Sequence, residues 1–131
     1  MAEYCNGANG GVPKAMDNMA TAKKSVNDGH YAIAKQQAIA VQKAADQCII
    51  ARQDPHGYAY IHAFGVIVEA QAQLGLNEIR SGKALMQQGM KEGQAIADDP
   101  QAEPTIRKLA KDIVTARRSS SSVSKRPNPE R

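Results

Sequence analysis

Residues 29–53, GHYAIAKQQAIAVQKAADQCIIARQ, give the clearest structural signal in this chain. Asn27 and Asp28 are good N-cap residue types, and Gly29 frees the backbone to turn into a helix. Apolar residues then recur three or four positions apart, at Tyr31, Ala34, Ala38, Val41, Ala45 and Cys48. This spacing places them along one face of an α-helix. Because most of these side chains are small, a neighbouring helix must come close to fill the space beside them.

Length and composition indicate a single all-α domain. The chain has 131 residues with four Tyr, one Phe and no Trp, so it can build only a small core. Val, Ile and Leu do not form the short, evenly spaced alternating runs that are typical of an all-β sandwich. There is no apolar run of roughly 18 residues, so we expect no membrane span.

The positive charge is unevenly distributed. Of the formal charge of +4, about half comes from residues 119–131, which contain three basic side chains and one acidic one. The rest of the chain is nearly balanced, which argues against a nucleic-acid-binding surface. Residues 119–131, SSSSVSKRPNPER, are polar and have no apolar stripe, so we expect a disordered tail.

Turn signals divide the chain into an irregular lead-in at residues 1–12, a helical domain at 13–118, and the tail. Pro13 suits the first turn of a helix ending near Val26. The short turn that follows makes residues 29–53 return antiparallel to that helix. Further helices are expected at about 55–74, 77–97 and 104–117, with Asn77 as a cap. We therefore predict an antiparallel bundle of four to five helices. The expected inward side chains outside residues 29–74 are Met16, Met19, Ala20, Val26, Ile79, Met86, Met90, Ile96, Ile106, Leu109, Ala110 and Ile113.

Residues 56–68, HGYAYIHAFGVIV, could be read in two ways. Their aromatic and histidine side chains alternate with period two, and their composition favours a strand. A single strand would have no partner in this chain, so we predict a helix. Its core-facing residues are then Ile61, Phe64, Gly65 and Val68.

Three glycines lie within the helix predicted at residues 77–97. Gly82, Gly89 and Gly93 are seven and four positions apart, which places them on one helix face. Each interior glycine costs roughly 0.5–1 kcal/mol of stability relative to Ala. We therefore expect another backbone to approach closely along this face.

The two cysteines suggest an oxidising compartment. The predicted hairpin brings Cys5, before the first helix, and Cys48, near the end of the second, to the same end of the molecule. A disulfide is sterically reasonable there, whereas two unrelated thiols are the alternative. An even cysteine count at facing positions favours a periplasmic or secreted protein whose signal peptide is absent from this sequence. A cytoplasmic protein with free thiols is the other possibility.

The hairpins resemble those of tetratricopeptide repeat proteins. Gly29, Tyr31 and Ala34 open the second helix of one pair, and Gly75 has a similar place in the next pair. Over residues 13–97, the resemblance implies a curved stack of hairpins that binds a peptide or helix in its groove. The matching glycines are 46 residues apart rather than the 34 of that family, and Ala38 replaces its expected bulky residue. A closed bundle explains the same pattern without a repeat.

Catalytic motifs are absent from the sequence. There is no GxGxxG, P-loop, GxSxG or HExxH pattern, so we predict a protein that is not an enzyme. His56, Tyr58, Tyr60 and His62 form the densest polar and aromatic group, but the histidine spacing fits no zinc motif. This group can be read as a ligand or metal pocket at the start of its helix, or as ring packing at a helix end. Two methionine pairs, Met16 with Met19 and Met86 with Met90, could bind copper(I) or serve as core filler. We predict no cofactor and no metal site.

These patterns predict a non-catalytic, exported interaction module that binds a protein or peptide. An immunity or inhibitor-type protein fits this description, and a periplasmic metal or cofactor carrier is the alternative. Monomeric and homodimeric forms are both compatible with the small-residue helix faces. The expected partner-binding residues are Tyr58, His62, Glu69, Gly82, Gly89 and Gly93.

Overall fold

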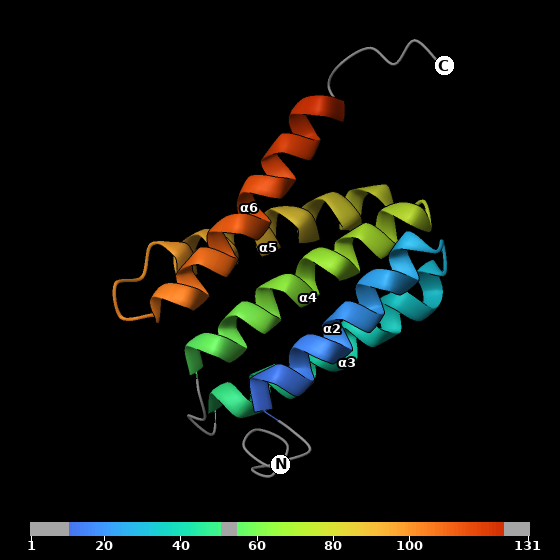
Figure 1. Cartoon of the computed structure of the whole chain (residues 1–131). Coiled ribbons are helices and arrows are strands. Elements are labelled where there is room, and N and C mark those ends of the chain that lie inside the picture. Colours follow the sequence, from blue (N-terminus) through green and yellow to red (C-terminus); the bar gives the residue numbers. More distant parts are fainter. Residues whose placement is uncertain (1–10, 51–54, 125–131) are drawn as a thin grey trace.

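The computed structural model describes residues 11–50 and 55–124, and in these residues it contains five helices and no strand. The helices are α2 (Gly11–Asn27), α3 (Tyr31–Ile50), α4 (Pro55–Gly75), α5 (Ile79–Ala97) and α6 (Pro104–Ser124). They run back and forth as an antiparallel bundle (Figure 1). The predicted all-α class is therefore confirmed. No helix in the described part of the chain is both long and apolar enough to span a membrane.

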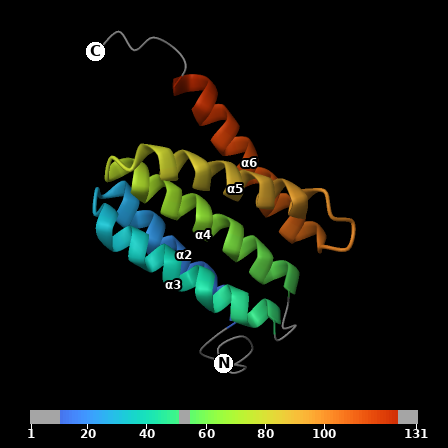
Figure 2. The same cartoon turned by 180° about the vertical axis from the view of Figure 1, so that it is seen from behind.

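The central element of the bundle is α4. The α2–α3 pair packs against one side of this helix, and α5 and α6 pack against the other side (Figures 1 and 2). Buried residues occur all around α4, as expected for a helix enclosed by others. The part of the stretch 29–53 that forms α3, residues 31–50, therefore lies on a flank of the bundle rather than at its centre, and residues 51–53 lie outside the described residues.

The ambiguous segment 56–68 is helical, as predicted. Ile61, Gly65 and Val68 are buried, and Phe64 is half-buried against the same core. Period-two alternation did not produce a strand, because side chains on every face of α4 find helices to pack against.

α2 and α3 form the predicted hairpin. Gly29 has a φ of +82° in the connecting turn, a conformation that favours glycine. The predicted stripe of α3 is buried from Ala34 to Cys48, with Tyr31 half-buried. On α2 the prediction was partly wrong: Met19 is buried, but Ala20 is exposed. The inward face of α2 is instead formed by Ala15, Met19 and Ala22.

The turn between α4 and α5 differs from the prediction in two ways. Asn77 does not cap α5; it adopts a φ of 66°, and the N-cap residue is Glu78, whose side chain makes no capping hydrogen bond. Ile79 is 42% exposed rather than inward. Gly75 ends α4 as predicted, and a Cβ there would lie 2.5 Å from Cγ of Tyr31. The ring of Tyr31 therefore fills the space that a larger residue would need.

The predicted close approach at the glycine face of α5 is confirmed. Gly82, Gly89 and Gly93 are all buried. A Cβ on Gly89 would lie 3.2 Å from the backbone nitrogen of Ile67 on α4, and one on Gly93 would lie 2.9 Å from Cγ2 of Val114 on α6. This glycine face therefore allows α5 to fit between α4 and α6. Ile96 is buried as expected, whereas Met86 and Met90 are half-buried.

α6 begins at Pro104 as predicted but continues past the expected end at residue 117. Residues 119–124, assigned to a disordered tail from their composition, belong to this helix, and 125–131 lie outside the described residues. Ile106, Ala110 and Val114 are buried, and Leu109 and Ile113 are half-buried. The C-terminal end of α6 projects beyond the other helices (Figure 1).

Candidate functional site

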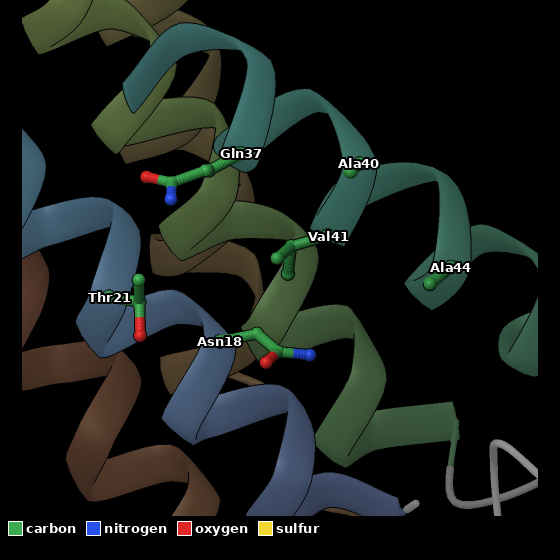
Figure 3. Close-up of a pocket in the computed structure, with 6 residues that line it drawn as sticks. All are labelled: Asn18, Thr21, Gln37, Ala40, Val41 and Ala44. Carbon is green, nitrogen blue, oxygen red and sulfur yellow. The ribbon is translucent and has the colours of Figure 1, made fainter. Parts of the chain in front are cut away.

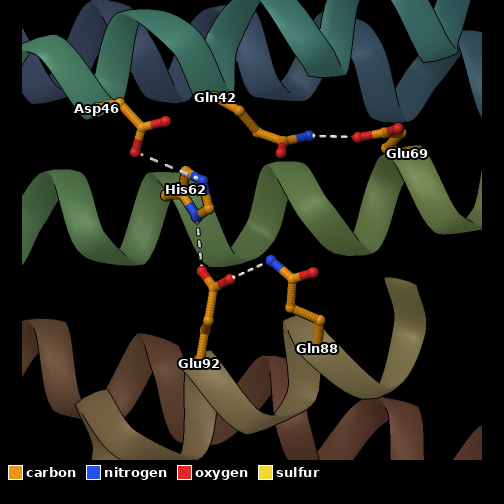
Figure 4. A network of polar contacts seen from close by, with 6 residues as sticks. All are labelled: Gln42, Asp46, His62, Glu69, Gln88 and Glu92. Atoms are coloured by element: carbon orange, nitrogen blue, oxygen red, sulfur yellow. Dashed lines mark hydrogen bonds and ion pairs between the residues drawn. The ribbon is translucent and has the colours of Figure 1, made fainter. Parts of the chain in front are cut away.

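Four of the six residues expected to bind a partner are packed inside the bundle. Tyr58 is fully buried, and the three glycines of α5 lie against α4 and α6. These residues therefore contribute to packing between helices and do not face outward. His62 and Glu69, both on α4, are half-buried. They belong to a group of polar side chains between α3 and α5, here called the polar seam, whose other members are Gln42, Asp46, Gln88 and Glu92 (Figure 4).

His62 connects α4 with the helices on both of its sides (Figure 4). Its Nδ1 lies 2.6 Å from Oε1 of Glu92 on α5, and its Nε2 lies 3.5 Å from Oδ1 of Asp46 on α3. Both ring nitrogens can donate to these carboxylates only when the imidazole is protonated. The side chain of His62 is 19% exposed, so this pair is partly shielded from water.

The surroundings of His62 and Glu92 favour the charged form of both side chains. The hydrogen bond with Glu92 raises the pKa of His62 above its usual 6.5; burial opposes this effect, and the charges of Glu92, Asp46 and Glu69 add to it. Burial alone would raise the pKa of Glu92, but the hydrogen bonds from His62 and Gln88 and the charge of His62 lower it below the usual 4.5. The two pKa shifts agree in direction: each favours the charged form of its group, as an ion pair between His62 and Glu92 requires.

Glu69 extends the seam along α4. Its carboxylate accepts a hydrogen bond of 2.9 Å from Nε2 of Gln42 on α3 (Figure 4) and one of 3.2 Å from Nε2 of Gln73 on α4. Nε2 of Gln88 donates to Oε2 of Glu92 at 2.8 Å on the α5 side. Each carboxylate of the seam is therefore held by neighbouring side chains.

The aromatic and histidine group of the sequence is not brought together at one point. Nε2 of His56 lies 3.4 Å from Oδ2 of Asp99, in the loop between α5 and α6, whereas His62 faces Glu92. The rings of Tyr60 and Phe64 pack with their centroids 6.0 Å apart. Among residues 11–50 and 55–124, no group of three His, Cys, Asp or Glu side chains has an arrangement that could hold a metal ion.

A second feature is an open cleft of about 310 Å³ on the outer face of the α2–α3 hairpin (Figure 3). The described residues that line it are Asn18, Thr21, Gln37, Ala40, Val41 and Ala44. None of these side chains carries a charge, and most are small. Ile33, which is 54% exposed, lies one helical turn before Gln37 on the same side of α3. This cleft was not predicted from the sequence, because its walls come from two different helices.

Cys48 is buried near the C-terminal end of α3, which lies at the same end of the hairpin as the start of α2 (Figure 1). The predicted partner, Cys5, lies outside the described residues. The disulfide therefore stays a prediction, consistent with where the hairpin places Cys48.

Comparison of this chain with protein-family models, curated proteins and solved structures gives no match. The resemblance to tetratricopeptide hairpins likewise stays a prediction.

Proposed function

We propose that this protein is a non-catalytic interaction module that receives an α-helical segment of a partner protein in the cleft between α2 and α3. The observation that supports this proposal is the lining of the cleft. Thr21, Ala40 and Ala44 are small residues that line this cleft between two antiparallel helices. Small side chains let a third helix approach to the roughly 8–10 Å axial separation of packed helices.

The chemistry of the cleft indicates which face of a partner would fit. Its uncharged lining suits the apolar face of an amphipathic helix, and Ile33 offers an exposed apolar contact at one end. Asn18 and Gln37 provide amide groups that can hydrogen-bond to polar side chains at the edge of such a helix. A partner helix with small or branched apolar residues at every third or fourth position meets these requirements.

Site-specific photo-crosslinking tests the proposal. A photoreactive amino acid at Gln37 should crosslink to one discrete partner in cells that make the protein, whereas the same group at exposed Ala95 on α5 should not. A third position, Gln88, tests the surface near His62, which was predicted from the sequence to bind the partner. Crosslinking from Gln88 but not from Gln37 would place the partner on the other face and refute the cleft proposal.

Filling the cleft provides a matched test. Ala40→Trp should abolish the crosslink from Gln37, because the indole ring would occupy the cleft. Ala84→Trp, at an exposed position of α5, should leave it intact. Both variants should keep the helical circular dichroism spectrum of the wild type. Retention of the crosslink in a folded Ala40→Trp protein would contradict the proposal.

We also propose an exported setting for this module. The support is the sequence pattern of two cysteines together with the burial of Cys48 near the C-terminal end of α3, the end of the hairpin at which α2 begins. A disulfide to the lead-in would close a loop of about 40 residues and stabilise the fold by roughly 3–4 kcal/mol. Such a bond persists in the periplasm or outside the cell.

A further inference from the structure

The seam at His62 joins the two halves of the bundle. The α2–α3 pair lies on one side of α4, and α5 and α6 lie on the other. From α4, the ring of His62 meets Asp46 of α3 at 3.5 Å and Glu92 of α5 at 2.6 Å. One side chain of the central helix therefore holds a carboxylate from each half (Figure 4).

The charged side chains that raise the pKa of this ring are all acidic. Asp46 faces it from α3, Glu92 from α5, and Glu69 from α4 itself. These three carboxylates, from α3, α4 and α5, are the described charged groups that shift the pKa of His62. A neutral imidazole has one donor and one acceptor nitrogen, so one of its two carboxylate contacts becomes an acceptor facing an acceptor. Loss of the proton therefore both removes the attraction and leaves three carboxylates around an uncharged ring.

We propose that His62 forms a pH-dependent link between helices, here called the cross-tie. When His62 is protonated it holds α5 to α3 across α4, and when it loses its proton α5 is held less tightly. This device is independent of the α2–α3 cleft. A folded-state pKa above 6.5 means that the stabilisation is fully present below 6.5 and is lost as the pH rises through the folded-state value. The loosening therefore occurs on the alkaline side of the usual histidine range.

Amide hydrogen exchange, followed by NMR on the full chain across the titration of His62, tests the cross-tie. After correction for intrinsic exchange rates, protection of the α5 amides around Glu92 should fall as the pH rises. The fall should be tenfold for each pH unit by which the pKa of His62, measured in the same spectra, exceeds 6.5. Amides on the buried face of α2, around Met19, are the internal reference and should lose less protection.

Two variants complete the test. His62→Gln cannot be charged, so its α5 protection should not change with pH. His56→Gln is the matched control: His56 also lies on α4 beside a carboxylate, but its partner, Asp99, belongs to the loop between α5 and α6. This control should behave like the wild type.

Three results would overturn the cross-tie. They are constant α5 protection while wild-type His62 titrates, an equal loss in α2 and α5, and the wild-type pH dependence in His62→Gln. If His62→Gln does not fold, the comparison of α5 with α2 in the wild type decides the question alone.

Discussion

Replacing Gly89 by Ala tests whether the close approach of α5 to α4 stabilises this fold. A Cβ at residue 89 would lie 2.5 Å from Cγ1 of Ile67 and 3.2 Å from its backbone nitrogen. It would also lie 3.3 Å from Cγ1 of Val66. Contacts shorter than 3.0 Å require one of the groups to move.

Two opposing effects set the size of the change. Ala is favoured over Gly in a helix by roughly 0.5–1 kcal/mol. Inserting a methyl group into a packed core costs about 1–3 kcal/mol. Ile67 is buried and β-branched, and its Cγ1 lies next to the backbone, so the side chain cannot swing away easily. We therefore expect a packing cost in the upper half of its range and a net destabilisation of roughly 1–2.5 kcal/mol.

Urea unfolding followed by far-UV circular dichroism measures this difference, with midpoints compared at a common slope. Ala95→Gly, at an exposed position of α5, is the calibrating variant. It changes helix propensity alone and should cost roughly 0.5–1 kcal/mol. If Gly89→Ala were as stable as the wild type or more stable, while Ala95→Gly lost the expected amount, the close approach would not be needed and the reasoning would be refuted.

Three further predictions concern the turn, the ion pair and the cysteines. Gly29→Ala should lower the free energy of unfolding by about 1 kcal/mol through backbone strain alone, since φ is +82° and no atom lies within 4 Å of the added Cβ. Denaturant unfolding at neutral pH measures this loss, and an unchanged midpoint would contradict the prediction. Because the folded-state pKa of Glu92 lies below 4.5, the contribution of this carboxylate is present above pH 4.5 and is lost as the pH falls through the folded-state value. Glu92→Gln should therefore flatten the acid side of the stability curve measured between about pH 3 and pH 6, and an unchanged acid limb would argue against the His62 pair. Under non-reducing, denaturing conditions, neither Cys5 nor Cys48 should react with an alkylating reagent; two alkylated thiols in the intact mass would remove the argument for export.

The sequence was sufficient to predict the helices, because helical periodicity and turn residues are local properties. The stripe from Ala34 to Cys48, the turn at Gly29 and the proline at position 104 each indicate their element without knowledge of its neighbours. The glycine face of α5 also predicted a close helix contact, since the cost of interior glycines requires a compensating gain. The C-terminal boundary of α6 was predicted too early, because a serine-rich composition carries no stripe to follow.

Which helix lies at the centre, and which side chains meet, depended on tertiary structure. An amphipathic pattern is compatible with a helix on the flank of a bundle, but it does not show which helix lies at the centre. Only the packing of all five described helices places α4 between two pairs. Asp46, His62 and Glu92 come from three helices, and nothing in their separate sequence positions pairs them. The same is true of the cleft between α2 and α3. Periodicity is encoded within one helix, whereas a site between helices depends on their relative rotation and register, which are set by the side chains of every helix in the core.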